Sequence, residues 1–243
     1  MVADRAPLLL LPGMLCDGRV FAPQIQSMGC AGDRSLVCDL TQSSTIAGMA
    51  ARVLDTAPPS FSLAGLSLGG IVAIEICRQA PERVLRLALL DTSTLADTPE
   101  RRQARQLQVE RARRGDLESL VRDDLAPRYF SAANRRREDL LRIVVGMAMA
   151  VGPDAFLRQA AAVNGRQDTS ALLSRIRCPT LVLCGDADEL CPPAHHAEIA
   201  AALPCALLRV ISECGHLSTL EQPEAVSAAL GDWLNQPCGK PVD

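Results

Sequence analysis

Short, mostly apolar runs separated by helical segments most constrain how this chain can fold. Leu8–Leu11 is wholly apolar and ends at Pro12–Gly13, which is typical of a buried parallel strand followed by a sharp turn. The same pattern recurs further along the chain, at Ser35–Cys38, Phe61–Ala64, Arg86–Leu90, Thr180–Cys184 and Leu207–Ile211. The pattern predicts about six buried strands.

Helical periodicity fills the intervals between these strands. The expected helices lie at about Val20–Met28, about Thr45–Ala57, Leu68–Gln79, Ala194–Ala202 and Pro223–Leu234. Pro223 fits the first turn of the last of these, because proline needs no amide partner there. Buried strands alternating with helices imply an α/β fold with a doubly wound, mostly parallel sheet.

One stretch breaks the alternation. Residues of about 95–165 are rich in Ala and Arg and show helical rather than strand periodicity, with breaks near Gly115, Pro127 and Gly152–Pro153. We therefore expect a core formed by residues 1–94 and 171–243, and a helical cap formed by residues 95–170. In such sheets ligands bind at the carboxyl ends of the strands.

Composition excludes several function classes. The net charge is −3, aromatic residues are 2% of the chain, and the basic runs, such as Arg101–Arg102 and Arg111–Arg114, are interleaved with acids. This pattern indicates a solvated helical face and no nucleic acid partner. No apolar stretch is long enough for membrane insertion, and Met1–Leu11 lacks the features of a signal peptide.

The ten cysteines are scattered singly and form no Cys-x-x-Cys pair. A structural zinc site is therefore not expected. Cys38 and Cys184 lie inside apolar runs and are predicted to be small buried hydrophobes. Together these features predict a reduced, cytoplasmic protein.

The strongest local motif is Gly65–Leu66–Ser67–Leu68–Gly69, which follows a predicted strand and opens a predicted helix. A serine on such a tight turn projects its hydroxyl from the edge of the sheet, where it can act as a nucleophile. Glycines flank it because the turn brings the chain close to its neighbours.

A serine nucleophile needs a base, and the chain has three histidines. His216 follows the strand Leu207–Ile211 and so lies at the same edge of the sheet as Ser67. His195 and His196 are adjacent near the start of a helix, and we predict both to be surface or capping residues. His216 is therefore the candidate base.

The base needs a carboxylate to fix its tautomer. Asp186, Asp188 and Glu189 share the loop after Thr180–Cys184, and Asp91 ends another strand. The residues alone do not decide between Asp186 and Asp188.

The order Ser, Asp, His, together with the serine turn and the Gly-x-x-Asp loop, resembles the α/β-hydrolase superfamily from Leu8 to Trp233. Within it the chain is most similar to compact carboxylesterases such as the pimeloyl-carrier-protein methyl ester carboxylesterases, and to enol-lactone hydrolases. In this family the acid commonly stands three residues after the glycine that ends its strand. The resemblance therefore implies Asp188, three residues after Gly185, and leaves Asp186 as a turn former.

The resemblance also implies an oxyanion hole made by two backbone amides. One is that of Leu68, and the other is that of Met14, in the loop after the first strand. The sequence departs from the family in three ways: Pro12 replaces a usual histidine, Asp39–Ser44 replaces a Gly-rich loop, and the family's N-terminal hairpin is expected to be absent.

The implied activity is hydrolysis of small or medium carboxylic esters through an acyl-enzyme, with no metal or organic cofactor. C–C bond hydrolysis, lactone opening and cofactor-free perhydrolysis are alternatives on the same residues, and a non-catalytic ligand-binding protein is another. The natural substrate and the oligomeric state are left open. Apolar cap residues that could touch a substrate are Tyr129, Phe130, Ile143, Met147, Met149 and Phe156.

Overall fold

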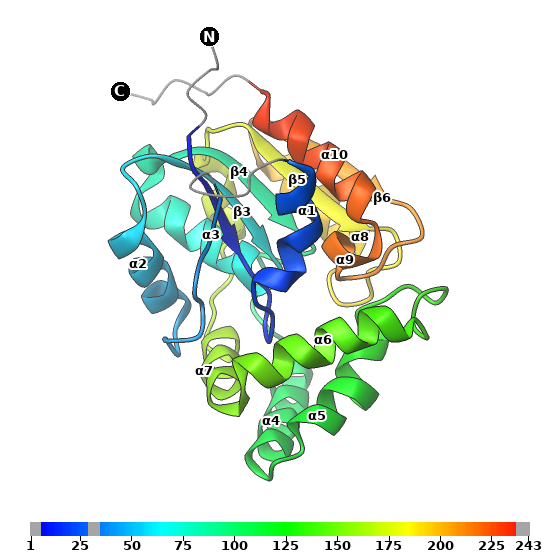
Figure 1. Ribbon diagram of the computed structural model, residues 1–243. Helices are drawn as coiled ribbons and strands as arrows, with labels where there is room; N and C mark the ends of the chain where they lie inside the picture. The colour runs from blue at the N-terminus through cyan, green and yellow to red at the C-terminus, as the bar shows by residue number, and fades with distance from the viewer. Residues whose placement is uncertain (1–5, 29–34, 237–243) are drawn as a thin grey trace.

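The computed structural model describes residues 6–28 and 35–236 and is built on one six-stranded sheet (Figure 1). The strands are β1 (Leu8–Leu11), β2 (Ser35–Val37), β3 (Phe61–Leu66), β4 (Val84–Leu90), β5 (Thr180–Gly185) and β6 (Ala206–Ile211). Their order across the sheet is β2-β1-β3-β4-β5-β6, and every neighbouring pair is parallel. The predicted α/β class and parallel sheet are confirmed. Cys30 and Cys238 lie outside the described residues.

Helices cover both faces of this sheet (Figure 1). One face carries α1 (Ala22–Ser27), α9 (Ser218–Glu221) and α10 (Pro223–Leu234), and the other carries α2 (Ile46–Thr56), α3 (Leu68–Gln79) and α8 (Pro193–Ala202). Strand β1 shows how the sequence produces two cores: Leu8 and Leu10 join one apolar cluster, while Leu9 and Leu11 join the other. Alternate side chains of a strand point to opposite faces, so an unbroken leucine run fills both.

The helix expected at Val20–Met28 is shorter than predicted. A 3-10 turn, Gly18–Phe21, precedes α1, and the Asp17 side chain caps the turn by accepting from the Arg19 amide. Pro23 lies in the first turn of α1, where a proline is favourable, so the α-helix begins only after the 3-10 turn.

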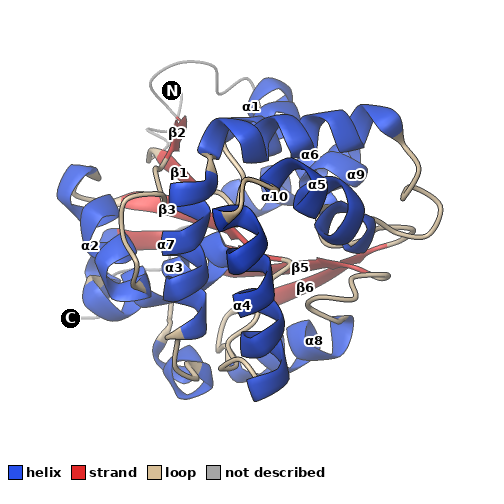
Figure 2. Ribbon diagram, turned by 90° about the horizontal axis from the view of Figure 1, so that it is seen from below, coloured by secondary structure: helices blue, strands red, loops and turns tan. Residues whose placement is uncertain are grey.

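The segment between β4 and β5 is helical throughout its regular elements, and Figure 2 shows it lying across the end of the sheet. It comprises α4 (Pro99–Arg113), α5 (Leu117–Ser119), a π-helical segment (Leu120–Leu125), a 3-10 turn (Ala126–Arg128), α6 (Glu138–Val151), α7 (Pro153–Asn164) and a 3-10 helix (Ser170–Arg175). The predicted breaks are confirmed: Gly115 and Gly152 have φ of 92° and 81°, and Pro127 lies in the 3-10 turn. The division into a core and a cap domain stays a prediction.

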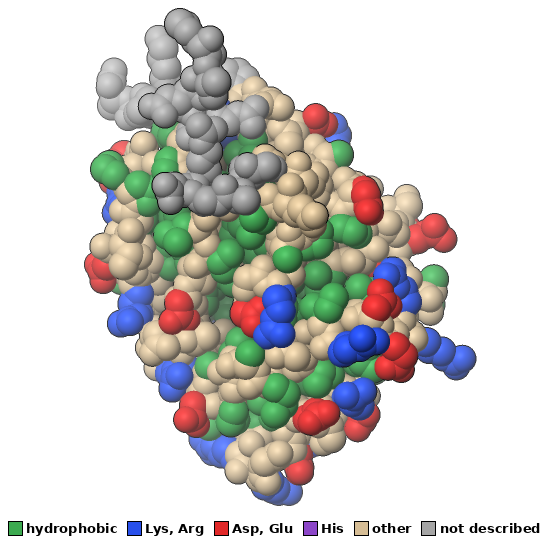
Figure 3. All heavy atoms as spheres, viewed as in Figure 1, with side chains coloured by type: hydrophobic (Ala, Val, Ile, Leu, Met, Phe, Trp, Pro, Cys, Tyr) green, Lys and Arg blue, Asp and Glu red, His purple; other side chains and the backbone are tan. Residues whose placement is uncertain are grey.

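Across the described ranges, no single helix has the length and apolarity to cross a bilayer. Helices α6 and α7 pass that test of length and composition only as a pair, and they are bent by 92°. On the face shown in Figure 3, basic and acidic side chains are interspersed over the helices between β4 and β5.

Gly69 lets α3 pack directly against β1. A Cβ built at Gly69 would lie 2.0 Å from the Leu11 carbonyl oxygen, which belongs to the backbone and cannot rotate away. We expect Gly69→Ala to lower the free energy of unfolding by about 3 kcal/mol, as overpacking against rigid backbone does. The matched control is Gly231→Ala in α10, where an added Cβ meets nothing within 4 Å. That variant should be stabilised by about 0.5–1 kcal/mol. Urea titration of both variants tests this, and equal effects would contradict it.

Candidate active site

Ser67 sits on the turn between β3 and α3 in a strained backbone conformation, with φ 53° and ψ −112°. Non-glycine residues rarely adopt positive φ, and such strain persists where the surrounding structure enforces it. Two hydrogen bonds do so: the Ser67 amide donates to the Leu90 carbonyl at 2.9 Å, and the Thr92 hydroxyl donates to the Ser67 carbonyl at 2.7 Å. A Cβ at Gly65 would lie 2.3 Å from the Gly69 carbonyl oxygen, which explains the flanking glycines. The backbone thus fixes the serine at the end of β3.

His216 reaches Ser67 from the loop that follows β6. Its Nε2 lies 2.9 Å from the Ser67 Oγ, and the side chain is buried. Tyr129 of the helical segment contacts this loop in two ways. The His216 amide donates to the Tyr129 carbonyl at 2.7 Å, and the Tyr129 ring centroid lies 6.1 Å from that of the imidazole. The Gly215 amide donates to the Glu221 carboxylate at 2.7 Å. The structure therefore brings together two side chains that are far apart in sequence.

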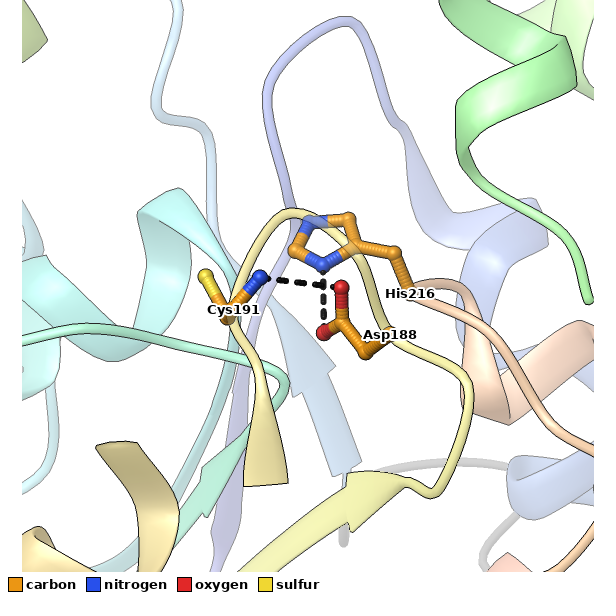
Figure 4. Close-up of side chains that lie close together, drawn as sticks. All are labelled: Asp188, Cys191 and His216. Carbon is orange, nitrogen blue, oxygen red and sulfur yellow. Dashed lines mark hydrogen bonds and ion pairs between the residues drawn. The ribbon is translucent and has the colours of Figure 1, made fainter. Parts of the chain in front are cut away.

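Asp188 is the carboxylate that faces this histidine (Figure 4). Its Oδ2 lies 2.8 Å from His216 Nδ1, and its Oδ1 accepts from the amides of Leu190 and Cys191 at 2.8 and 2.9 Å. Asp186 is exposed and accepts from the Cys214 amide at 3.1 Å. The residues alone left two acids open. Asp188 contacts the imidazole of His216, and Asp186 binds the backbone of the loop that leads to His216.

Asp91, the further acid considered from the sequence, directly follows β4 and is fully buried. Its carboxyl group accepts from the Gly185 amide at 3.1 Å and from the Ser218 hydroxyl. Burial, and then the nearby charge of Asp188, raise the pKa of Asp91 to about 8. Asp91 thus links the two loops that carry Asp188 and His216.

His196 corrects a prediction. It is completely buried rather than at the surface, and its Nε2 accepts from the Thr92 amide at 2.9 Å. Burial lowers its pKa to about 4, so the ring is neutral at physiological pH. His195 is half-buried. His196 supports Thr92, which in turn binds the Ser67 carbonyl.

Met14 and Leu68 line the same cavity as Ser67 and His216. Leu68 is the first residue of α3, where helix amides lack intrahelical partners. The loop before Met14 packs against the serine: a Cβ at Gly13 would lie 3.6 Å from the Ser67 Cβ. Both predicted oxyanion residues therefore adjoin the serine.

The sequence did not reveal Gln159, a buried residue of α7. Its Oε1 accepts from the Leu15 amide at 3.0 Å, and Leu15 has φ 57°. Gln159 therefore fixes the loop that contains Met14. A glutamine within an amphipathic helix gives no sign of such a long-range contact.

The cavity has a volume of about 330 Å³ and is roofed by the segment between β4 and β5. Of the six apolar cap residues proposed from the sequence, Tyr129 lines it. Met147, Phe130 and Phe156 are buried in the core, Ile143 packs against that core, and Met149 is 48% exposed.

Charged side chains also line this cavity. Arg101 belongs to a run predicted as a solvated face, and for this residue the prediction is wrong, because Arg101 lines the cavity. Its Nη2 donates to the Leu190 carbonyl at 2.7 Å. The wall of the cavity is therefore more basic than the sequence indicated.

Asp188, Cys191 and His216 form a group whose potential metal-ligating atoms lie within 4.8 Å of one another. Figure 4 shows the Cys191 amide nitrogen, rather than the sulfur, directed at Asp188. Burial, and then the charge of Asp188, raise the pKa of the Cys191 thiol well above its ordinary value, which disfavours the thiolate that binds metals. Asp188 and His216 also use their facing atoms on each other. The donor set fits a hydrogen-bonded acid–base pair better than a metal site.

A parallel sheet with a strained serine on a strand-to-helix turn, and a histidine and a carboxylate from later loops, defines the class of α/β hydrolases. The chain belongs to the alpha/beta hydrolase family, whose model matches residues 6–229.

Individual relatives differ in their assigned reactions. The chain is 27% identical over 240 residues to the "Putative carbamate hydrolase RutD" of Rhizobium rhizogenes, covering 91% of this chain and 89% of that one. It is 28% identical over 183 residues to a pimeloyl-[acyl-carrier protein] methyl ester esterase of Nitrosomonas europaea, covering 71% and 70%. The enol-lactonase of Burkholderia xenovorans LB400 superposes with a TM-score of 0.85 at 23% identity, covering 97% and 94%, which shows the fold alone. The family is thus established, and the comparisons support a hydrolase.

Proposed function

We propose that this protein hydrolyses small or medium carboxylic esters through an acyl-enzyme formed on Ser67. The observation that carries the proposal is the continuous hydrogen-bonded series from Ser67 Oγ through His216 to Asp188, with spacings of 2.9 and 2.8 Å. This is the arrangement that turns a weak serine hydroxyl into a nucleophile. The similarity to the methyl ester esterase of N. europaea supports the choice of esters.

In the proposed reaction, His216 removes the proton of Ser67 as the serine oxygen attacks the ester carbonyl. The amides of Met14 and Leu68 stabilise the oxyanion. The tetrahedral intermediate collapses, the carbon–oxygen bond to the alcohol breaks, and His216 returns the proton to the leaving alcohol. Water activated by the same histidine then hydrolyses the acyl-enzyme. No metal or organic cofactor takes part in this scheme.

Asp188 supports the histidine electrostatically. Burial alone would lower the pKa of His216, but the charge of Asp188 and its hydrogen bond outweigh burial and raise that pKa above 6.5. The pKa of Asp188 is shifted in the opposite direction. Burial alone would raise this pKa, but the charge of His216 and the hydrogen bond to it lower the pKa below its ordinary value. Asp188 therefore stays ionised and stabilises the imidazolium that forms during turnover.

This pKa shift predicts the pH dependence. The base must be neutral to accept a proton, so kcat/KM should rise with pH through a midpoint above 6.5. The measurement uses an ester without titratable groups between pH 5 and 9, and circular dichroism at each pH excludes unfolding. A midpoint at or below 6.5 would contradict the assigned electrostatics.

The helices between β4 and β5 are proposed to act as a cap that sets specificity. The substrate would be a small molecule, since the cavity volume is about 330 Å³. We further propose a cytoplasmic location, supported by the free thiols of Cys16, Cys38 and Cys77, and no nucleic acid partner.

Carbamate hydrolysis is a second candidate, favoured by the assigned reaction of the R. rhizogenes relative. The same nucleophile and oxyanion hole would serve it, since a carbamate carbonyl passes through a similar tetrahedral intermediate. Steady-state assays on matched p-nitrophenyl esters and N-alkyl carbamates separate the two candidates by kcat/KM.

A fluorophosphonate probe tests whether the site is catalytic at all. Native protein should gain one phosphonyl group on the peptide that contains Ser67, and heat-unfolded protein should not react. Lack of labelling, together with no turnover of esters, carbamates or lactones, would favour a ligand-binding protein of this fold.

A further inference from the structure

The wall of the cavity carries an excess of positive charge. It contains four guanidinium groups and two carboxylates. These groups are Arg101, Arg105, Arg128 and Arg166, against Asp97 and Glu100. A cleft lined mainly by one sign of charge attracts ligands of the opposite sign.

Two of the arginines have a structural explanation. The Asp97 side chain is fully buried and is shared by Arg105 and Arg166, whose Nη2 lies 2.8 Å from the Asp97 Oδ1. Arg105 also donates to the Asn164 side chain at 2.6 Å. This network fastens α4 to the end of α7. Because one carboxylate serves two guanidinium groups, the network itself retains positive charge.

Arg101 and Arg128 have no such explanation. Arg101 donates to a neutral acceptor, the Leu190 carbonyl. Arg128 is exposed at the edge of the cavity. Among the described residues, neither has a carboxylate within ion-pair distance. Glu100 is fully exposed and bonds to the Thr98 side chain at the start of α4. Arg101 and Arg128 therefore stand outside any ion pair of the described residues, and the cavity wall has more guanidinium groups than carboxylates.

Arg101 is also close to the reacting groups. Its bond to Leu190 ties α4 to the loop that holds Asp188, and its charge opposes protonation of His216. An anionic group bound by Arg101 would thus lie in the same cavity as the Ser67 hydroxyl.

We propose that the cavity selects esters that carry a carboxylate or a similar anionic group, bound by Arg101 and Arg128. This specificity rests on the proposed ester hydrolase function. A guanidinium presents paired donors that match a carboxylate, and such charge-assisted bonds are stronger than neutral ones.

The test compares substrates that differ in charge and hardly in shape. One pair is monomethyl glutarate and its terminal amide, which place the group on the acyl side. The other is 4-acetoxybutanoate and 4-acetoxybutanamide, which place it on the alcohol side. For at least one pair, kcat/KM should favour the anion by at least about tenfold, the factor expected for a charge-assisted hydrogen bond.

The variants are Arg101→Gln and Arg128→Gln, with Arg102→Gln as the matched control on the exposed face of α4. The first two should each reduce the anion-to-amide ratio at least about threefold, and the control should keep the wild-type ratio. Because a general loss of activity lowers kcat/KM for both members of a pair, it leaves the anion-to-amide ratio unchanged. Calorimetry of the Ser67→Ala protein with the intact pairs, whose members are an anion and a neutral amide, supplies a readout that does not require turnover.

The outcomes separate the two proposals. If both members of each pair are hydrolysed equally well, the anion specificity is wrong and the ester hydrolase stands. If no ester is hydrolysed, the proposed function is wrong, and calorimetry decides the anion site. Tighter binding of the anionic member of a pair than of its amide, lost when Arg101→Gln is added, supports that site; equal binding in both pairs overturns it.

Discussion

Ser67→Ala should lower kcat/KM for ester hydrolysis by about 10⁴- to 10⁶-fold while the protein stays folded. The variant deletes the oxygen that lies 2.9 Å from His216 Nε2 and leaves the amides of Met14 and Leu68 in place. Residual activity would come from those amides and from substrate binding. Alanine retains the Cβ, so the strained turn between β3 and α3 is kept. Initial rates at matched, high enzyme concentration measure the loss, and fluorophosphonate labelling should vanish with it.

Ser62→Ala is the matched control, because Ser62 lies on β3, the strand that leads to Ser67, and its buried hydroxyl has no partner among the described groups. Its removal should change kcat/KM less than about twofold, since a buried hydroxyl without a hydrogen bond contributes no favourable contact. Equal losses of kcat/KM in the two variants would mean that Ser67→Ala lowers activity by disturbing the fold rather than by removing the nucleophile. Full activity of Ser67→Ala would remove the serine from the mechanism.

The sheet could be predicted from the sequence because buried parallel strands leave a strong local signal. The leucines of β1 serve two cores at once, so the run is apolar without interruption. Errors were confined to strand ends: β3 continues through Leu66, because the turn itself begins only at Ser67. The positions of Ser67 and His216 followed from the same strands, since loops after parallel strands meet at one edge.

The basic cavity wall could not be predicted, and the reason is physical. A helix that packs on an apolar core shows a hydrophobic stripe that identifies its buried face. Helix α4 contributes Arg101 and Arg105 to the cavity wall instead, and Ala112 is its one buried residue. Its periodicity therefore does not distinguish Arg101, which lines the cavity, from Arg102, which is exposed. His196 was misplaced for a related reason, because its partner is a backbone amide distant in sequence.

The choice between Asp186 and Asp188 came from a family resemblance rather than from the residues, so it needs a direct test. We expect Asp188→Asn to lower kcat by about 10⁴-fold. The asparagine oxygen can still accept from the amides of Leu190 and Cys191, so the loop keeps its shape. The amide nitrogen would then face His216 Nδ1 and, being a donor, favour the tautomer that cannot accept the Ser67 proton.

Asp186→Asn is the paired control, because its oxygen can keep the bond to the Cys214 amide and the side chain is exposed. Its kcat should fall less than about threefold, as expected for a conservative change at a solvent-exposed position. The nitrogen chemical shifts of His216 give a second readout: without the Asp188 charge, the pKa of His216 should fall, whereas Asp186→Asn should leave it in place. A large loss in Asp186→Asn with little in Asp188→Asn would assign the supporting carboxylate to Asp186, and the 2.8 Å contact between Asp188 and His216 would then have no catalytic role.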